Sequence, residues 1–159
     1  MRLAFAFAAL TPLALTSCAT TPPADAEAAS RAPSPAEVVA ARQAAFNLTA
    51  ATFGSMRGAV ESGGDVKPLA FGARGLNRWG HAIPSMFPAG TQLPGSRALP
   101  TVWTDRAGFE VQAAMFQAAT AKLVAAAQSG DSAAFGAAYK EVGGTCGSCH
   151  STYRGSEAK

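Results

Sequence analysis

A five-residue motif near the end of the chain, Cys146-Gly147-Ser148-Cys149-His150, constrains the fold more than any other feature. Thiols at this spacing lie on one face of a helix, and the histidine follows the second thiol directly. This is the attachment pattern of c-type haem, in which each thiol forms a thioether with a haem vinyl group and the imidazole binds the iron. The motif predicts one covalent haem c, attached to Cys146 and Cys149, with His150 as the metal ligand.

Two other interpretations of the motif are weaker. The residues could be two ordinary cysteines beside an ordinary histidine, or they could bind zinc. A zinc site normally needs four ligands. The further candidate ligands are Cys18, far away near the N-terminus, and His81.

Length, charge and residue pattern indicate one helical domain that is not an enzyme. The chain has 159 residues, enough for a hydrophobic core, and its formal net charge of +3 is too small to indicate a nucleic-acid partner. Alanine is abundant and no stretch alternates like a strand, which favours an all-α protein. No acid–base pair or nucleophile constellation is visible.

The N-terminus is predicted to be a lipoprotein-type signal peptide, residues 1–17. A positive Arg2 precedes an apolar stretch, residues 3–15, that is too short to span a bilayer. Leu15-Thr16-Ser17-Cys18 resembles a bacterial lipobox, in which the cysteine becomes the lipidated first residue of the mature protein. The alternative is an ordinary secretory peptide with a chance cysteine.

Export to the periplasm follows from either interpretation and suits c-type haem, which is attached outside the cytoplasm. Ala19, and not aspartate, follows Cys18. By resemblance to Gram-negative lipoproteins, this favours an anchor in the outer membrane, so that the protein would meet the membrane only through its lipid. Residues 18–33, the lipidated N-terminus and the segment after it, contain three prolines and are predicted to form a flexible tether.

Residues 34–155 are predicted to form four helices, followed by a tail at residues 156–159. The first begins at a capping box of Ser34 and Glu37 and continues to the glycines at positions 63 and 64. The second begins near Asp65 and ends or kinks at Pro84. Residues 87–101, rich in proline and glycine, are predicted to form an ordered loop.

The third and fourth helices carry the clearest periodicity. The third is expected from about Thr101 to Ser129, with Gly130 as its stop and Asp131 as the next N-cap. Apolar positions in both helices recur with alternating spacings of four and three, and this pattern places both motif cysteines on the inner face of the fourth. The predicted fold is an all-α, antiparallel four-helix bundle with haem c held by the C-terminal helix.

Over residues 36–154 the chain resembles the cytochromes c′, the class II c-type cytochromes. Class I cytochromes c place the haem motif near the N-terminus and supply a methionine later, whereas only nine residues follow His150. The resemblance rests on the C-terminal motif with Ser151-Thr152-Tyr153-Arg154 after it, on Phe87-Pro88-Ala89-Gly90-Thr91, and on Ala98-Leu99-Pro100-Thr101-Val102-Trp103.

The resemblance assigns the remaining cofactor contacts. Arg42 and Gln43 match an Arg-Gln pair that contacts the haem propionates, which suits anions that need cationic or amide donors; a solvated helix face is the alternative. Arg97 falls in a loop position that also contacts haem. Arg154 lies one helical turn after His150, on the proximal side. The aromatic residues Phe87 and Trp103 are expected to wall the pocket.

Phe46 occupies the family's distal position, four residues after the arginine, and phenylalanine cannot bind iron. The resemblance therefore implies five-coordinate iron. The alternative is a six-coordinate, low-spin class II cytochrome that acts only as an electron carrier, with a ligand such as Met56 or His81. We expect His81 at the surface or packed within the second helix, and we expect the methionines Met56, Met86 and Met115 to be core residues.

Two functions compete, and both belong to the periplasm. One is electron transfer with periplasmic or membrane redox partners. The other is binding or scavenging of small gases, nitric oxide above all and carbon monoxide. A four-helix interaction module without haem would require the motif to be accidental. The resemblance also implies a homodimer through the first two helices, which carry small residues that permit close contact: Ala40, Ala44, Ala45, Ala70 and Gly72.

Overall fold

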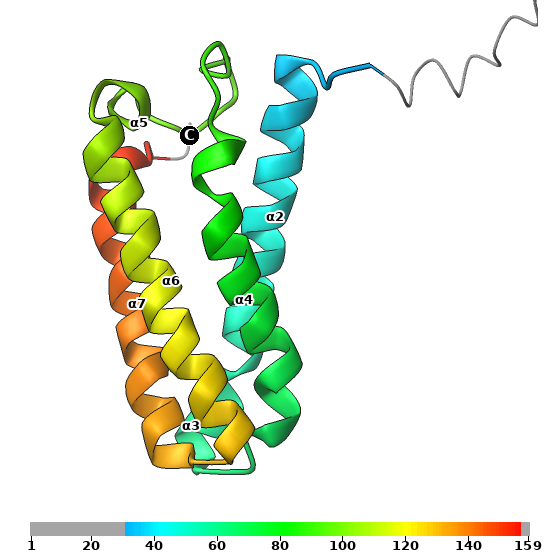
Figure 1. Ribbon diagram of the computed structural model, residues 1–159, viewed down its shortest axis with the longest axis vertical. Helices are drawn as coiled ribbons and strands as arrows, with labels where there is room; N and C mark the ends of the chain where they lie inside the picture. Colours follow the sequence, from blue (N-terminus) through cyan, green and yellow to red (C-terminus); the bar gives the residue numbers. More distant parts are fainter. Residues whose placement is uncertain (1–30, 157–159) are drawn as a thin grey trace, which may run out of the picture. The chain divides into compact units, whose positions relative to one another are not determined.

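The structure is a computed structural model that describes residues 31–156; the predicted signal peptide and the lipidation site Cys18 lie outside the described residues. From Pro33 onward it is an antiparallel four-helix bundle, as the sequence predicts (Figure 1). The long helices are α2 (Pro35–Ser55), α4 (Ala70–Ala82), α6 (Arg106–Ser129) and α7 (Ser132–Tyr153). Short elements lie between them: α3 (Arg57–Ser62), η1 (Lys67–Leu69), η2 (Pro84–Met86) and α5 (Thr101–Thr104).

The helices pack unequally, and this inequality positions the site. Helix α6 packs extensively against both α7 and α4, whereas α2 packs against α4 and makes no close backbone approach to α6 or α7. Figure 1 shows α6 beside α7 and α2 beside α4. The interior between α2 and α7 is therefore not closed by direct helix packing.

The helix ends predicted at Ser34, Gly130 and Asp131 are confirmed. Ser34 and Glu37 form the reciprocal capping box at the start of α2. Gly130, with a φ of 77°, ends α6, and a left-handed conformation of this kind favours glycine. One residue later Asp131 accepts a bond from the backbone N–H of Ala134 at 2.9 Å and so begins α7.

Two predicted helices are interrupted. The first stops at Ser55 and resumes as α3, because the Gly54-Ser55 pair is a weak helix former and Met56 turns inward, with 1% of its surface exposed. The third is divided into α5 and α6 by Asp105. Its carboxylate accepts the N–H of Gly108 at 3.2 Å, which favours a new helix start over continuation.

The core follows the predicted periodicity of the third and fourth helices. The positions that recur along α6 with spacings of four and three are all buried, and so are three of those on α7: Phe109, Ala113, Phe116, Thr120, Leu123 and Ala127, and Phe135, Val142 and Tyr153. Met56 is a core residue as expected, and Met86 is half-buried. The prediction for Met115 was wrong: it is 47% exposed, because its neighbour Phe116 occupies the inward position of that turn. His81 is exposed, which agrees with the surface location, one of the two locations that the sequence predicted for it.

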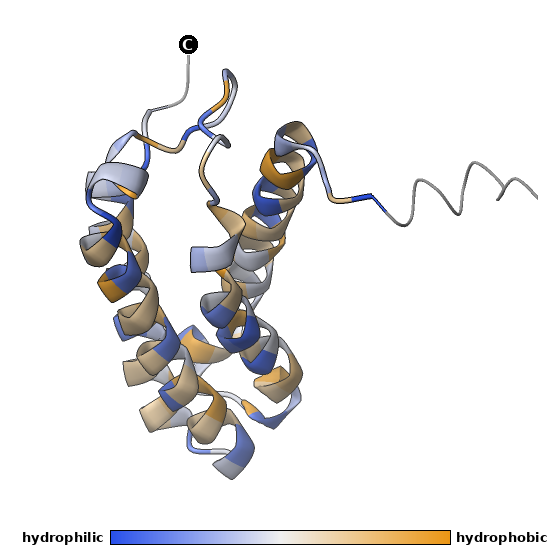
Figure 2. Ribbon diagram, turned by 45° about the horizontal axis from the view of Figure 1, so that its top comes forward, coloured by the Kyte–Doolittle hydropathy of each residue, from blue (hydrophilic) through white to orange (hydrophobic). Residues whose placement is uncertain are grey.

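No helix among the described residues is long and apolar enough to cross a membrane. Figure 2 shows hydrophilic positions interspersed with hydrophobic ones along the helices that face the viewer.

A contact beside α6 gives a test of the packing. A methyl group added at Gly108 would overlap the carboxylate of Asp105 and the hydroxyl of Tyr153. Gly108→Ala should therefore lower the free energy of unfolding by about 1–3 kcal/mol, the usual cost of overpacking. Urea denaturation of the haem-loaded protein measures this.

The matched control is Gly54→Ala, where nothing lies within 4 Å of the added methyl group. That change should leave stability unchanged or raise it by up to about 1 kcal/mol. Equal effects of the two substitutions would contradict the packing around Gly108.

Candidate haem site

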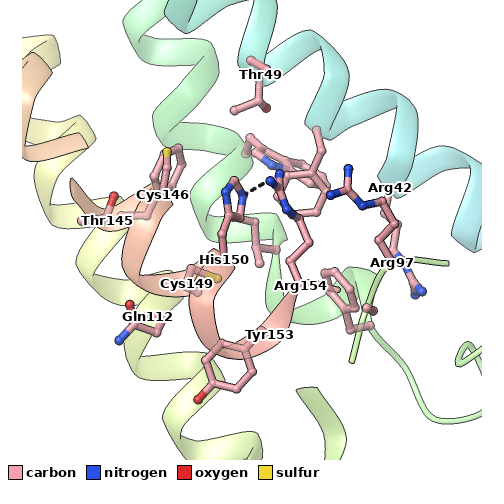
Figure 3. A pocket seen from close by; sticks show the side chains of 18 of the residues that line it. Arg42, Thr49, Arg97, Gln112, Thr145, Cys146, Cys149, His150, Tyr153 and Arg154 are labelled. Carbon is pink, nitrogen blue, oxygen red and sulfur yellow. Dashed lines mark hydrogen bonds between the residues drawn. The ribbon is translucent and has the colours of Figure 1, made fainter. Parts of the chain in front are cut away.

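A cavity of about 690 Å³ lies within the bundle, with side chains of all four long helices and of the loop at residues 87–101 on its walls (Figure 3). Every residue predicted to contact the cofactor lines it: Arg42, Gln43, Phe46, Phe87, Arg97, Cys146, Cys149, His150 and Arg154. Trp103 does not. Its indole N–H is directed to the carbonyl oxygen of Pro88 at 3.1 Å, so the expectation that it walls the pocket was wrong.

The motif cysteines lie on α7 with their side chains half-buried. Both are free thiols. Burial raises the pKa of each, and the neighbouring Cys146 raises the pKa of Cys149 further. The two sulfurs are therefore protonated at neutral pH, unbonded to each other, and carried by one helix at the cavity wall.

His150 is kept neutral by its surroundings. Burial lowers its pKa, and the positive charges of Arg154 and Arg97 lower it further. A neutral imidazole has a lone pair to offer a metal. Arg154 Nη1 lies 3.3 Å from His150 Nε2, the contact drawn as a dashed line in Figure 3.

Arg42 has a role that the sequence did not predict. Arg42 is 2% exposed, and its guanidinium forms hydrogen bonds with the loop at residues 87–101 and with the residue before it. Nη1 donates to Thr91 Oγ1 at 2.8 Å and to the Met86 carbonyl at 3.3 Å, while Nη2 donates to the Thr91 carbonyl and to Ser96 Oγ, each at 2.8 Å. Beside it, Gln43 donates to the carbonyl of Gly95 at 3.0 Å.

The far end of the same loop is bonded to the end of α7. Ala98 and Arg154 form an isolated antiparallel bridge. The Leu99 N–H donates to the Tyr153 carbonyl at 3.0 Å, and the Gly155 N–H donates to the Arg97 carbonyl at 2.8 Å. One loop thus contacts α2 on one side of the cavity and the residues that follow the haem motif on the other.

Aromatic rings close the α2 side. Phe46 packs perpendicular to Trp79 with ring centroids 5.1 Å apart, and it lies 6.2 Å from Phe87. Deeper along α2, Phe53 stacks on Tyr139 at 4.1 Å. Trp79 was not predicted as a site residue, although it follows the buried Leu76 by three positions and so shares its face of α4.

The residues present fit a covalent haem. The two thiols and the neutral imidazole lie on one helix, and the opposite walls are mainly apolar and aromatic. Of the residues that the structure describes, three arginines and no carboxylate line the cavity, which gives a positive potential suited to two propionates. The Trp79 indole nitrogen is buried without a hydrogen-bond partner, the one such side-chain atom in the part of the chain that the structure describes.

Comparisons with known proteins show the family of the chain, and the curated relatives include proteins named cytochrome c′, cytochrome c-556 and cytochrome c-554. The sequence profile of the family described as Cytochrome C' matches residues 37–154. Cytochrome c′ of Rubrivivax gelatinosus is 36% identical over 116 residues, which are 71% of this chain and 90% of that protein. Cytochrome c′ of Alcaligenes xylosoxydans is 34% identical over 118 residues, 73% of this chain and 91% of that protein.

Solved structures agree with the sequence comparisons. A nitric oxide complex of a mutant of cytochrome c prime from Alcaligenes xylosoxidans superposes with a TM-score of 0.73 at 31% identity, and covers 80% of this chain and 100% of that one. Cytochrome c′ of Rubrivivax gelatinosus superposes with a TM-score of 0.72 at 34% identity, over 78% of this chain and 99% of that one.

Tyr153 gives a test of the geometry near the motif. Its hydroxyl donates to Asp105 at 2.6 Å, and this bond, with burial and the carboxylate charge, raises the pKa of Tyr153 to about 12. The folded protein therefore keeps a proton that the unfolded chain loses near pH 10, so stability should fall as the pH rises from about 10 towards 12.

Ultraviolet titration of the tyrosines measures this directly. A late transition near pH 12 should be present in the wild type and absent in Tyr153→Phe. Tyr139→Phe is the matched control and should retain the transition. A Tyr153 that titrates near 10 would contradict the bond to Asp105.

Proposed function

Because the chain belongs to the cytochrome c′ family, we propose that its haem iron is five-coordinate, with His150 as its only protein ligand, and that the opposite side of the haem binds small gases. Proteins of this family carry one covalent haem c. The haem supplies an iron centre for ligand binding and one-electron exchange, and this chain's residues decide what reaches it.

The composition of the cavity wall carries the five-coordinate proposal. Among residues 31–156, no methionine or lysine lines the cavity, and His150 is the one histidine that does. The alternative ligands weighed from the sequence, Met56 and His81, are not among the lining residues. Tyr153 lines the cavity from the same helix as His150, but its hydroxyl is bonded to Asp105. These positions argue against the six-coordinate, low-spin electron carrier.

Nitric oxide and carbon monoxide are the ligands that the distal wall favours. Phe46 offers neither a lone pair nor a hydrogen-bond donor, and dioxygen gains much of its stability from such a donor. The similar solved structures include a nitric oxide complex and a carbon monoxide complex of cytochrome c prime from Alcaligenes xylosoxidans. We place nitric oxide binding or scavenging first, without a defined catalytic centre, and electron transfer with a periplasmic or membrane partner second.

Arg154 is placed to act on the side of the haem that His150 would bind. The atom that it contacts, His150 Nε2, is the atom expected to bind the iron. Arg154 can therefore donate to Nε2 whenever the imidazole is not coordinated. In this way it would stabilise a released His150 and assist a ligand that weakens the bond between iron and histidine.

We assign the N-terminus by the same proposal. Residues 1–17 are the signal peptide, Cys18 is lipidated, residues 18–33 form the tether, and residues 34–155 form the haem domain with a short tail after it. The protein would lie in the periplasm of a Gram-negative bacterium, anchored to the outer membrane. An N-terminal cysteine that carries a diacyl anchor is stably attached to the membrane, whereas a single acyl chain gives only marginal attachment.

A substitution at Phe46 tests the distal site. Phe46→Ala should speed carbon monoxide association with the ferrous protein at least tenfold, about 1.4 kcal/mol of barrier, because the ring no longer guards the iron. Flash photolysis measures the rate. Phe53→Ala, which removes the same volume from the same cavity two turns along α2, is the control and should change the rate less. An unchanged rate in Phe46→Ala would show that the ring does not cover the iron.

Substitution of Cys18 tests the anchor. Cys18→Ser should move the haem protein from the membrane fraction to the soluble fraction of the periplasm, while its visible spectrum stays the same. Fractionation with detection of haem absorbance measures both. A wild-type protein that is already soluble after export would refute the lipid anchor.

The proposed homodimer has a surface to test. Phe71 on α4 is 80% exposed and Leu48 on α2 is 69% exposed, and both line a shallow groove between these helices. Sedimentation of Cys18→Ser protein at micromolar concentration should show a dimer, and adding Phe71→Asp should give a monomer. Val111→Asp, at a 57% exposed position on α6, should not. A monomer without the Phe71 substitution would overturn the dimer.

A further inference from the structure

The hydroxyl of Ser96 joins two networks that lie on opposite sides of the cavity. Ser96 Oγ accepts one hydrogen bond from Arg42 Nη2 at 2.8 Å and another from the Ala98 N–H at 3.2 Å. The first partner belongs to α2, four residues before Phe46. The second belongs to the bridge with Arg154.

The position of Arg154 depends on that bridge. Helix α7 ends at Tyr153, and Arg154 has extended backbone angles, φ −122° and ψ 122°. The helix therefore does not fix the direction in which its side chain leaves. The pairing with Ala98, the bond from the Gly155 N–H to the Arg97 carbonyl and the bond from Arg97 Nε to the Gly155 carbonyl hold this backbone in place. These contacts bring the Arg154 guanidinium to His150 Nε2.

We propose that Ser96 is a positioning residue: it couples the buried Arg42 on α2 to the backbone of Arg154, and so sets where the Arg154 guanidinium lies beside the His150 imidazole, both when Nε2 is free to accept from Arg154 and when Nε2 would bind the iron. The inference rests on the proposed function, because it concerns the His150 bond to iron. The sequence of contacts is continuous: Arg42 bonds Ser96, Ser96 bonds Ala98, Ala98 pairs with Arg154, and Arg154 contacts His150.

Thr91 shows that this link is particular to Ser96. Its hydroxyl also accepts from Arg42 at 2.8 Å, but it donates to the carbonyl of Pro88. Thr91 thus connects the guanidinium to the first turn of the loop. The Ser96 side chain, in contrast, bonds both Arg42 and the bridge segment.

The test uses the full-length, haem-loaded ferrous protein. Resonance Raman spectroscopy reports the iron–histidine stretching band, which responds to the surroundings of the imidazole and not to general stability. Ser96→Ala should shift this band, and Ser96→Thr, which keeps a hydroxyl, should restore it. Ser85→Ala, which removes a hydroxyl bonded only to the nearby Ala82 carbonyl, should leave the band in place.

A double substitution tests the route. If Ser96 acts through Arg154, then Ser96→Ala should shift the band in the wild-type background and not in Arg154→Ala. Hydrogen exchange at the Leu99 and Gly155 amides, both bonded in the bridge segment, should be faster in Ser96→Ala.

The outcomes separate this inference from the function on which it rests. A band that Ser96→Ala does not move, an equal shift in the Arg154→Ala background, or unchanged amide exchange would overturn the coupling alone. Absence of a five-coordinate iron–histidine band from the wild-type protein would overturn the proposed coordination and the coupling together.

Discussion

The buried guanidinium of Arg42 is the interaction on which the rest of the site depends. A charge removed from water is costly unless its donors are satisfied. The acceptors of Arg42 come from Met86 and from the loop that follows, so the charge requires the loop and the loop is ordered by the charge. The Cζ atom of Arg42 also lies 4.4 Å from the centroid of the Phe87 ring, which adds a cation–π contact.

This arrangement explains how the bundle keeps an interior space. Helix α2 does not pack closely on α6 or α7, so side chains and a cofactor must fill the volume between them. At one end of that volume the loop, bonded to both α2 and the residues after α7, ties the two sides together. At depth, the stacked Phe53 and Tyr139 bring them into direct contact. The cavity is thus bounded by polar bonds at one end and aromatic packing further along.

Periodicity and capping predicted the helices and the inward direction of the motif, because these depend on neighbours within a few residues. The partners of Arg42 could not be predicted, since its acceptors lie 44 to 54 residues away and include backbone carbonyls. The break at Met56 and the exposure of Met115 depend on which side chain of a helical turn is directed into the core. Met56 is directed inward, whereas at Met115 the neighbouring Phe116 takes that position. The prediction that Trp103 lines the pocket was wrong for a related reason: its indole N–H donates to the carbonyl oxygen of Pro88, a contact that periodicity does not indicate.

Charge and shape divide the work between the two sides of the site. The proximal side carries the chemistry of attachment: thiols that burial keeps protonated, and an imidazole kept neutral by burial and by Arg154 and Arg97. Under the proposed coordination, the side formed by α2 and α4 contributes the rings of Phe46 and Trp79, and no methionine, lysine or second histidine among the described residues lines the cavity there. Such a site would select ligands by steric access to the iron on one side and by the strength of the histidine bond on the other. A loop that contacts both sides is the element through which these two controls can depend on each other.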